Sequence, residues 1–207
     1  MDRLKQLGNI PVGYSVLKTL FSEYTYPRNK IASLEKSGAL IRLKRGVFVV
    51  SPDISGALLS KELIANHLYG PSYVSMESAL RFHGVIPESV HIVRSMTIKR
   101  SRNFENSVGL FNYVSCDESY YAVGINQVLK DNHTFLIASA EKALCDLIAY
   151  TPMIRPRFIK SMKAYLEEDL RLDMNAFYDM NAGIFRQCAE TGKKKNDLNN
   201  LIKLMKR

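Results

Sequence analysis

Basic side chains gather between residues 28 and 45 of this 207-residue chain, where six of them accompany a single acid, Glu35. Lysine and arginine at this density bind phosphates, and such binding weakens with salt because counterions are released from the polyanion. Arg28 and Asn29 carry the side-chain types that read guanine and adenine edges in the major groove. The segment therefore favours contact with double-stranded DNA. The candidate DNA-binding residues are Arg28, Asn29, Lys30, Ser33, Lys36, Arg42, Lys44 and Arg45.

The alternative interpretation of the same residues is a solvated helix face followed by an ordinary charged hairpin. The excess of bases over acids favours DNA, because a basic stripe on one face is the electrostatic footprint of nucleic-acid binding. Within this interpretation Lys30, Lys36, Lys44 and Arg45 mainly anchor phosphates.

Two short helices and a hairpin must hold these side chains. Apolar residues at 16, 17, 20 and 21 follow the helical period and predict a helix over 14–24. Pro27 suits the first turn of a helix and Gly38 its end, which predicts a second helix over 27–37. Two β-prone runs in 39–50 flank the turn Lys44-Arg45-Gly46 and predict a hairpin. Together these elements predict a winged helix-turn-helix domain over residues 1–52.

The net charge of +9 is distributed unevenly along the chain. Residues 1–50 carry a net +6, residues 51–192 a net −2, and residues 193–207 a net +5. The basic excess therefore lies at the two ends. A hydrophobic share of 46% predicts an ordinary packed core. The three cysteines form no CxxC pair, and no long apolar stretch occurs, so we expect reduced thiols in a cytoplasmic protein without a membrane partner.

A larger second domain is predicted over residues 57–207. Ser75 can cap a helix over 76–83, and Ser139 can cap another that buries Ala140, Leu144 and Leu147. Strand patterns occur over 90–98, 108–114 and 134–138. The remainder is mostly helical and ends in a basic amphipathic helix over 197–207. The predicted fold class is α+β, with a winged helix-turn-helix followed by a larger mixed domain that ends in helices.

A second basic cluster occupies the middle of the chain. Arg94, Lys99, Arg100 and Arg102 occur with no acid between residues 88 and 105. Lys99, Arg100 and Arg102 are candidates for a second patch that extends a DNA track or meets an acidic partner. The alternative is an edge strand that its charges protect from pairing. The lysines at 193–195 are likewise open to two interpretations, nonspecific DNA affinity or solubility.

Acids and histidines form no catalytic or metal-binding pattern. Glu77, Glu141, Lys142 and Asp146 are scattered, with no signature that would hold Mg²⁺. Helix-dipole stabilisation accounts for Glu141, and Asp146 is expected on a helix surface. The four histidines are too dispersed for a zinc site. We expect no catalytic residue, metal or cofactor, and hence no enzyme.

Three segments carry a resemblance to a known family. They are residues 38–48 (GALIRLKRGVF), 70–88 (GPSYVSMESALRFHGVIPE) and 137–147 (IASAEKALCDL). In these segments the chain resembles the AbiEi-type antitoxins of type IV toxin–antitoxin systems. The resemblance implies a winged-helix domain that represses its own operon at upstream inverted repeats. It also implies a C-terminal domain that counteracts a nucleotidyltransferase-like toxin without a stable complex.

Two other functions remain open from the sequence. One is an antitoxin that neutralises its toxin by direct contact through the second domain. The other is a metal-dependent nucleic-acid-processing enzyme, which the scattered carboxylates disfavour.

Overall fold

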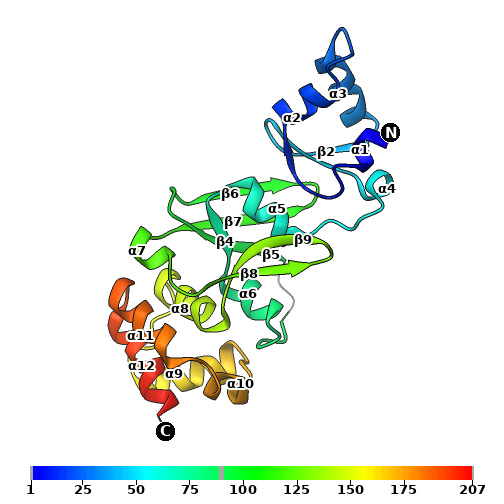
Figure 1. Ribbon diagram of the computed structural model, residues 1–207. Helices are drawn as coiled ribbons and strands as arrows, with labels where there is room; N and C mark the ends of the chain where they lie inside the picture. Colours follow the sequence, from blue (N-terminus) through cyan, green and yellow to red (C-terminus); the bar gives the residue numbers. More distant parts are fainter. Residues whose placement is uncertain (1, 89–90, 207) are drawn as a thin grey trace.

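The computed structural model describes residues 2–88 and 91–206 (Figure 1). The protein is a mixed α+β structure with two separate β-sheets, which confirms the expected class at this level. The smaller sheet lies near the N-terminus, the larger one lies in the middle, and helices gather at the C-terminal end (Figure 1). Within the described residues, no helix has the length and apolar character needed to cross a membrane.

The N-terminal elements surround the smaller sheet. They are α1 (Asp2–Lys5), β1 (Val12–Gly13), α2 (Tyr14–Leu20), α3 (Pro27–Lys36), β2 (Leu40–Lys44) and β3 (Val47–Val50). The three strands are antiparallel in the order β1-β3-β2. Leu17 of α2, Ile31 and Leu34 of α3, and Phe48 of β3 are buried together. This part of the chain therefore has a core of its own.

Helix α2 is shorter than its apolar pattern predicts. It ends at Leu20 rather than at residue 24, and Val16, expected on the buried face, is 46% exposed. Tyr26 adopts φ −130° and ψ 77°, because the residue before a proline avoids the helical conformation. Pro27 then opens α3, and Gly38 and Gly46 turn the chain with φ of 77° and 78°. The second helix and the hairpin are thus confirmed.

The hairpin β2–β3 contacts both parts of the molecule. Leu40, Phe48 and Val50 pack in the N-terminal core. Leu43 and Val49 instead belong to the core of the larger part. Successive side chains of a strand point to opposite faces, so a hairpin between two cores can serve both. Its turn therefore does not project freely into solvent.

Six strands form the larger sheet, in the order β6-β7-β5-β4-β9-β8. The pairs β5–β7 and β4–β9 are parallel, and the other neighbouring pairs are antiparallel. The expected strands correspond to β5, β7 and β9, although Val90 lies outside the described residues, and β4, β6 and β8 were not predicted. The bounds are β4 (Ser72–Val74), β5 (Ile92–Thr97), β6 (Arg102–Asn106), β7 (Gly109–Ser115), β8 (Ile125–Lys130) and β9 (His133–Ala138).

Helices lie on both faces of this sheet. Tyr113 of β7 donates a hydrogen bond to the Ala65 carbonyl of α5. Asn112, the preceding residue, stands opposite Arg94 of β5, and Arg94 binds Glu77 of α6. Because adjacent residues of a strand point to opposite faces, α5 and α6 lie on opposite sides. The remaining helices are α4 (Pro52–Ser55), α5 (Lys61–Leu68), α6 (Met76–Phe82), α7 (Glu118–Tyr121), α8 (Ala140–Tyr150), α9 (Ile159–Ala164), the π-helical segment η1 (Tyr165–Asp169), α10 (Met174–Tyr178), α11 (Ala182–Thr191) and α12 (Lys195–Met205).

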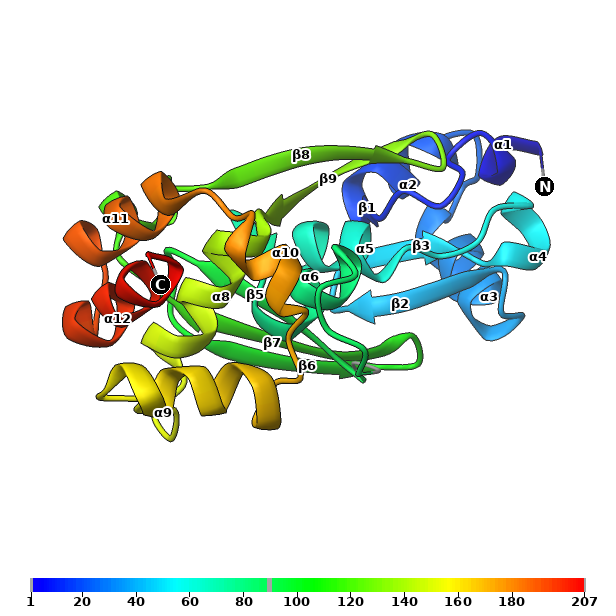
Figure 2. The same ribbon diagram turned by 90° about the horizontal axis from the view of Figure 1, so that it is seen from below.

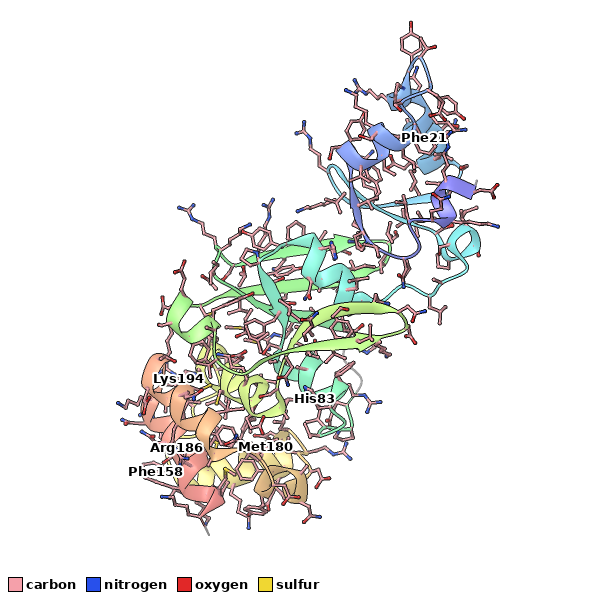
Figure 3. The ribbon with its side chains drawn as sticks, viewed as in Figure 1. Phe21, His83, Phe158, Met180, Arg186 and Lys194 are labelled. Carbon is pink, nitrogen blue, oxygen red and sulfur yellow. The ribbon has the colours of Figure 1, made fainter. Side chains whose placement is uncertain are left out.

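The C-terminal helices pack on α8 (Figure 2). The expected basic amphipathic helix is α12, and Arg207 lies outside the described residues. Lys194, labelled in Figure 3, has a structural role. Its Nζ donates to the carbonyls of Ile148, Thr151 and Ile154 at 2.8, 2.7 and 2.6 Å. Ile148 lies in the last turn of α8 and the other two residues lie beyond it, in the region where helix carbonyls lack intrahelical partners. Lys194 therefore caps α8 and is half-buried rather than free in solution.

Gly192, which separates α11 from α12, offers a test of this packing. A Cβ at this position would lie 2.6 Å from the carbonyl oxygen of Cys188 and would overlap the ring of Tyr120. We expect Gly192→Ala to lower the free energy of unfolding by about 1–3 kcal/mol, because overpacking forces neighbouring groups to move. Urea denaturation measures the loss. The matched control is Gly13→Ala, whose Cβ would meet nothing closer than 3.7 Å, and equal losses in both variants would contradict the packing.

Candidate nucleic-acid interface

The outward surface of α3 carries most of the side chains that the sequence singled out. Ile31 and Leu34 turn inward, which leaves the residues between them facing solvent. The Nζ of Lys30 lies 5.2 Å from the ring centre of Tyr24, which follows the end of α2. Phe21, labelled in Figure 3, packs edge-on against the same ring and fixes its position. Arg28, Asn29, Ser33 and Lys36 are exposed, and Lys30 is half-buried.

Arg42 is committed to an ion pair. Its Nε and Nη2 donate to the two carboxylate oxygens of Glu35 at 2.6 and 2.5 Å. The hydrogen bonds from Arg42 hold the pKa of Glu35 below its usual value. The guanidinium also lies 5.1 Å from the ring centre of Phe48. Arg42 therefore joins β2 to α3, and the pair has no net charge to offer a phosphate.

The side chain of Lys44 contacts the larger part of the molecule. Its Nζ donates to the Leu68 carbonyl at 2.5 Å and lies 5.7 Å from the ring centre of Phe104. Burial lowers the pKa of Lys44, and the neighbouring charges of Arg102 and Lys99 lower it further. Of the turn residues, Arg45 remains exposed, and among the residues described it makes no ion pair.

The second basic patch lies beside Lys44. Lys99 donates to the Gly70 carbonyl at 2.5 Å, and its Nζ lies 5.5 Å from the ring centre of Tyr69. The guanidinium of Arg102 lies 5.0 Å from the ring centre of Phe104. Arg100 is exposed. Lys44, Lys99 and Arg102 thus lie together although they are distant in sequence. With Arg45 and Arg100, their exposed sequence neighbours, they are here called the junction cluster.

The junction cluster has no acidic counterpart. Within residues 2–88 and 91–206, none of its five members forms an ion pair. Lys44 and Arg102 lie over the ring of Phe104 and Lys99 lies over that of Tyr69, and these two rings pack against Tyr113. Like charges held close together repel, so a bound polyanion would relieve the repulsion. Arg94, named with this patch in the sequence, does not join it, because it binds Glu77 on the opposite face of the sheet.

A buried polar network in α8 differs from what the sequence predicted. Asp146 was expected on a helix surface, but it is 0% exposed, and so is Lys142. Nζ of Lys142 lies 3.3 Å from Oδ1 of Asp146 and donates to the Tyr120 carbonyl at 2.8 Å. Oδ2 of Asp146 accepts hydrogen bonds from Tyr73 at 3.1 Å and Ser75 at 2.5 Å. Burial raises the pKa of Asp146, whereas Lys142 and the hydroxyl groups of Ser75 and Tyr120 oppose the rise.

This network has the geometry of a core support and not of an open active site. It ties α8 to β4 and α7, and all three cysteines are free and buried. Glu141 accepts a hydrogen bond from the Asn181 backbone, which connects α8 to α11. In the part of the chain that the structure describes, no three acidic, histidine or cysteine side chains converge on a possible metal site. The sequence signal for this burial was that Lys142 and Asp146, four residues apart, flank the apolar run Ala143, Leu144 and Cys145.

No protein-family model matches the chain, and no curated protein sequence matches it.

Proposed function

We propose that this chain is a DNA-binding antitoxin of the AbiEi type that represses its own operon in the cytoplasm. In this proposal residues 1–52 form a winged helix-turn-helix that binds inverted repeats in double-stranded operator DNA. The observation that carries it is the set of cations on α3 and at the β2–β3 turn that have no acidic partner among the described residues. The chain would act without a catalytic residue, metal or cofactor of its own.

The order of the N-terminal elements supports this assignment. Two helices, α2 and α3, precede an antiparallel hairpin that pairs with β1. In a winged helix-turn-helix the second helix enters the major groove with its N-terminal residues against base edges. Arg28 and Asn29 occupy the first turn of α3 and are exposed. They would read bases, whereas Lys30, Ser33 and Lys36 would hold phosphates.

The junction cluster would lengthen the phosphate contact beyond α3. Arg102 and Lys99 of the larger part lie close enough to Lys44 to lower its pKa, and Arg45 and Arg100 are exposed sequence neighbours of Lys44 and Lys99. Arg42, paired with Glu35, would contribute little. The DNA footprint would then include both parts of the chain.

Residues 57–207 would confer antitoxicity against a nucleotidyltransferase-like toxin. This part of the proposal depends on the resemblance in residues 70–88 and 137–147. A nucleotidyltransferase-like reading frame immediately downstream of the gene would support it. An unrelated neighbouring gene would count against it.

Operator binding is the decisive experiment. The full chain should retard DNA from upstream of its own gene more strongly than a shuffled sequence of equal length and composition. Binding should weaken steeply as salt rises, because several phosphates are neutralised together. Equal affinity for the two DNAs at every salt concentration would overturn sequence-specific repression, and no binding to either would overturn the DNA assignment.

Salt dependence distinguishes free from paired cations. We expect Arg45→Gln to reduce the slope of log K against log salt by about 0.9, the share of one phosphate contact. The double variant Arg42→Gln/Glu35→Gln removes an ion pair without changing the net charge, so its slope should equal that of wild type. Titrations of operator DNA between 50 and 200 mM salt, about the range over which such slopes are resolved, measure both. If the salt slope of the double variant were smaller than that of Arg45→Gln, the paired Arg42 would contact phosphate more than the unpaired Arg45, which would contradict the proposal.

A further inference from the structure

A large hollow lies on the face of the six-stranded sheet opposite the junction cluster. Its volume is about 1130 Å³, and its floor is formed by β5, β7 and β6. η1 and the segment after α6 form its sides. In Figure 2, α9 and the helical turns that follow it run alongside β6 and β7. Pockets that hold small ligands measure about 300–1,000 Å³, so this hollow has room for several side chains of a bound segment.

Strand alternation places the floor residues of the hollow on one face of the sheet. Ile92 of β5 and Leu110 of β7 are paired in register on the floor. Glu105 of β6 stands opposite Leu110 and also lines it. Helices α6 and α8 make their main contacts with the sheet at β5 and β9, so β6 and β7 have no helix packed on this face in the described part of the chain. Ile92 and Leu110 consequently remain 42% and 38% exposed.

The rim of the hollow is acidic in a protein whose net charge is +9. Two acids of its lining are paired: both oxygens of Glu77 accept from Arg94 at 2.9 Å, and Glu88 lies 3.4 Å from the guanidinium of Arg171. Glu105 and Asp169 are exposed and make no ion pair with any described residue. Burial, together with Glu77 and Asp169, raises the pKa of the Tyr165 hydroxyl. The local charge therefore opposes that of the molecule.

We propose that this hollow binds a segment of a protein partner in which apolar side chains are flanked by lysine or arginine. The apolar side chains would cover Ile92 and Leu110, and the basic ones would meet Glu105 and Asp169. Charge complementarity selects this chemistry, because the acidic rim repels nucleic acid. The chain's own basic C-terminal helix is not the occupant, since Leu198, Leu201 and Leu204 of α12 are buried in the helical layer.

Strand β6 separates the two binding surfaces. Arg102 and Phe104 point to the face of the junction cluster, and Asn103 and Glu105 point into the hollow. A polyanion on one face and a basic segment on the other would not compete for the same side chains. The hollow therefore adds a protein-binding surface to the proposed DNA-binding protein.

The test uses a displayed library of random nine-residue peptides selected on the full wild-type chain. Enriched peptides should combine Leu, Ile, Phe or Met with Lys or Arg. They should bind Glu105→Lys/Asp169→Lys about tenfold more weakly, because two attractive contacts become repulsive. Leu110→Ser should also weaken them without any change of charge. Glu190→Lys, an exposed acid on α11, is the matched control and should bind as wild type does.

Three results would overturn the proposal. One is the absence of enriched peptides, and another is enriched peptides that bind both hollow variants as tightly as wild type. The third is self-association of the wild-type chain, measured by analytical ultracentrifugation and abolished by Glu105→Lys/Asp169→Lys. The occupant of the hollow would then be a second copy of the chain. Thermal unfolding establishes that each variant is folded, and operator binding should be the same in all of them. Loss of operator binding by wild type would affect the proposed function and leave this test intact.

Discussion

Asp146→Ala should lower the free energy of unfolding by about 3–5 kcal/mol, because it leaves the ammonium group of Lys142 buried without its carboxylate. Both side chains are 0% exposed, so water cannot replace the lost partner. Tyr73 and Ser75 would lose their acceptor as well. Chemical denaturation monitored by circular dichroism measures the change.

The chain contains a matched control for this variant. Lys163 and Glu167 have the same i, i+4 spacing as Lys142 and Asp146, but both are exposed and their charged atoms lie 3.6 Å apart. Glu167→Ala should therefore cost less than about 1 kcal/mol. If Asp146→Ala and Glu167→Ala cost the same, the buried network contributes nothing beyond a surface pair.

A double variant separates the pair from the packing around it. Lys142→Met/Asp146→Leu replaces both charges with apolar groups and leaves no buried charge unpaired. Such replacements are often neutral or stabilising, so the double variant should be more stable than Asp146→Ala. If the double variant were no more stable than Asp146→Ala, the unpaired ammonium group of Lys142 would not be the cause of the loss.

Local sequence patterns were sufficient to predict the helices and strands that bury one face. The helix at 27–37 has a proline at its start, a glycine after its end and inward residues at 31 and 34, and the structure agrees within one residue. The hairpin was likewise predicted from two β-prone runs around Arg45-Gly46. In these segments the chain itself supplies both the start and the stop signals.

Strand β6 could not be predicted in this way. Its sequence, Arg102–Asn106, contains a single apolar residue, Phe104. It is a strand because it pairs with β7 and because Phe104 packs against Tyr69 and Tyr113. Tertiary context therefore overrides a weak local preference.

The sequence identified which residues belong to the candidate interface, but it did not predict the contacts that their side chains make. The exposed side of α3 follows directly from the helical period. The pairing of Arg42 with Glu35 and the docking of Lys44 on Leu68 depend on how the hairpin meets its neighbours. Likewise, residues 99–102 join Lys44 only through the order of strands in the larger sheet. Contacts between distant segments leave no periodic signal in the sequence.

Lys30→Glu should weaken operator binding by roughly a hundredfold, because a like charge placed against a phosphate costs several kcal/mol. Lys30 lies on the α3 surface beside Tyr24 and makes no ion pair with a described residue. The matched control is Lys160→Glu, an exposed lysine of α9 at the other end of the molecule, which should bind as wild type does (Figure 1). Gel retardation at fixed salt compares the three proteins. Equal affinities would remove α3 from the interface.

Base reading and phosphate anchoring on α3 are distinguishable by what each substitution does to specificity. Arg28→Ala should cost about 1–3 kcal/mol on the operator and should relax the preference for one base pair, because a base contact discriminates sequence. Lys36→Ala should instead weaken operator and shuffled DNA equally and reduce the salt slope by about one. Competition titrations with single-base operator variants measure the first effect, and salt titrations measure the second. If Arg28→Ala weakened all DNAs uniformly, the N-terminal turn of α3 would contact the backbone, and the bases would have to be read by other residues of the chain.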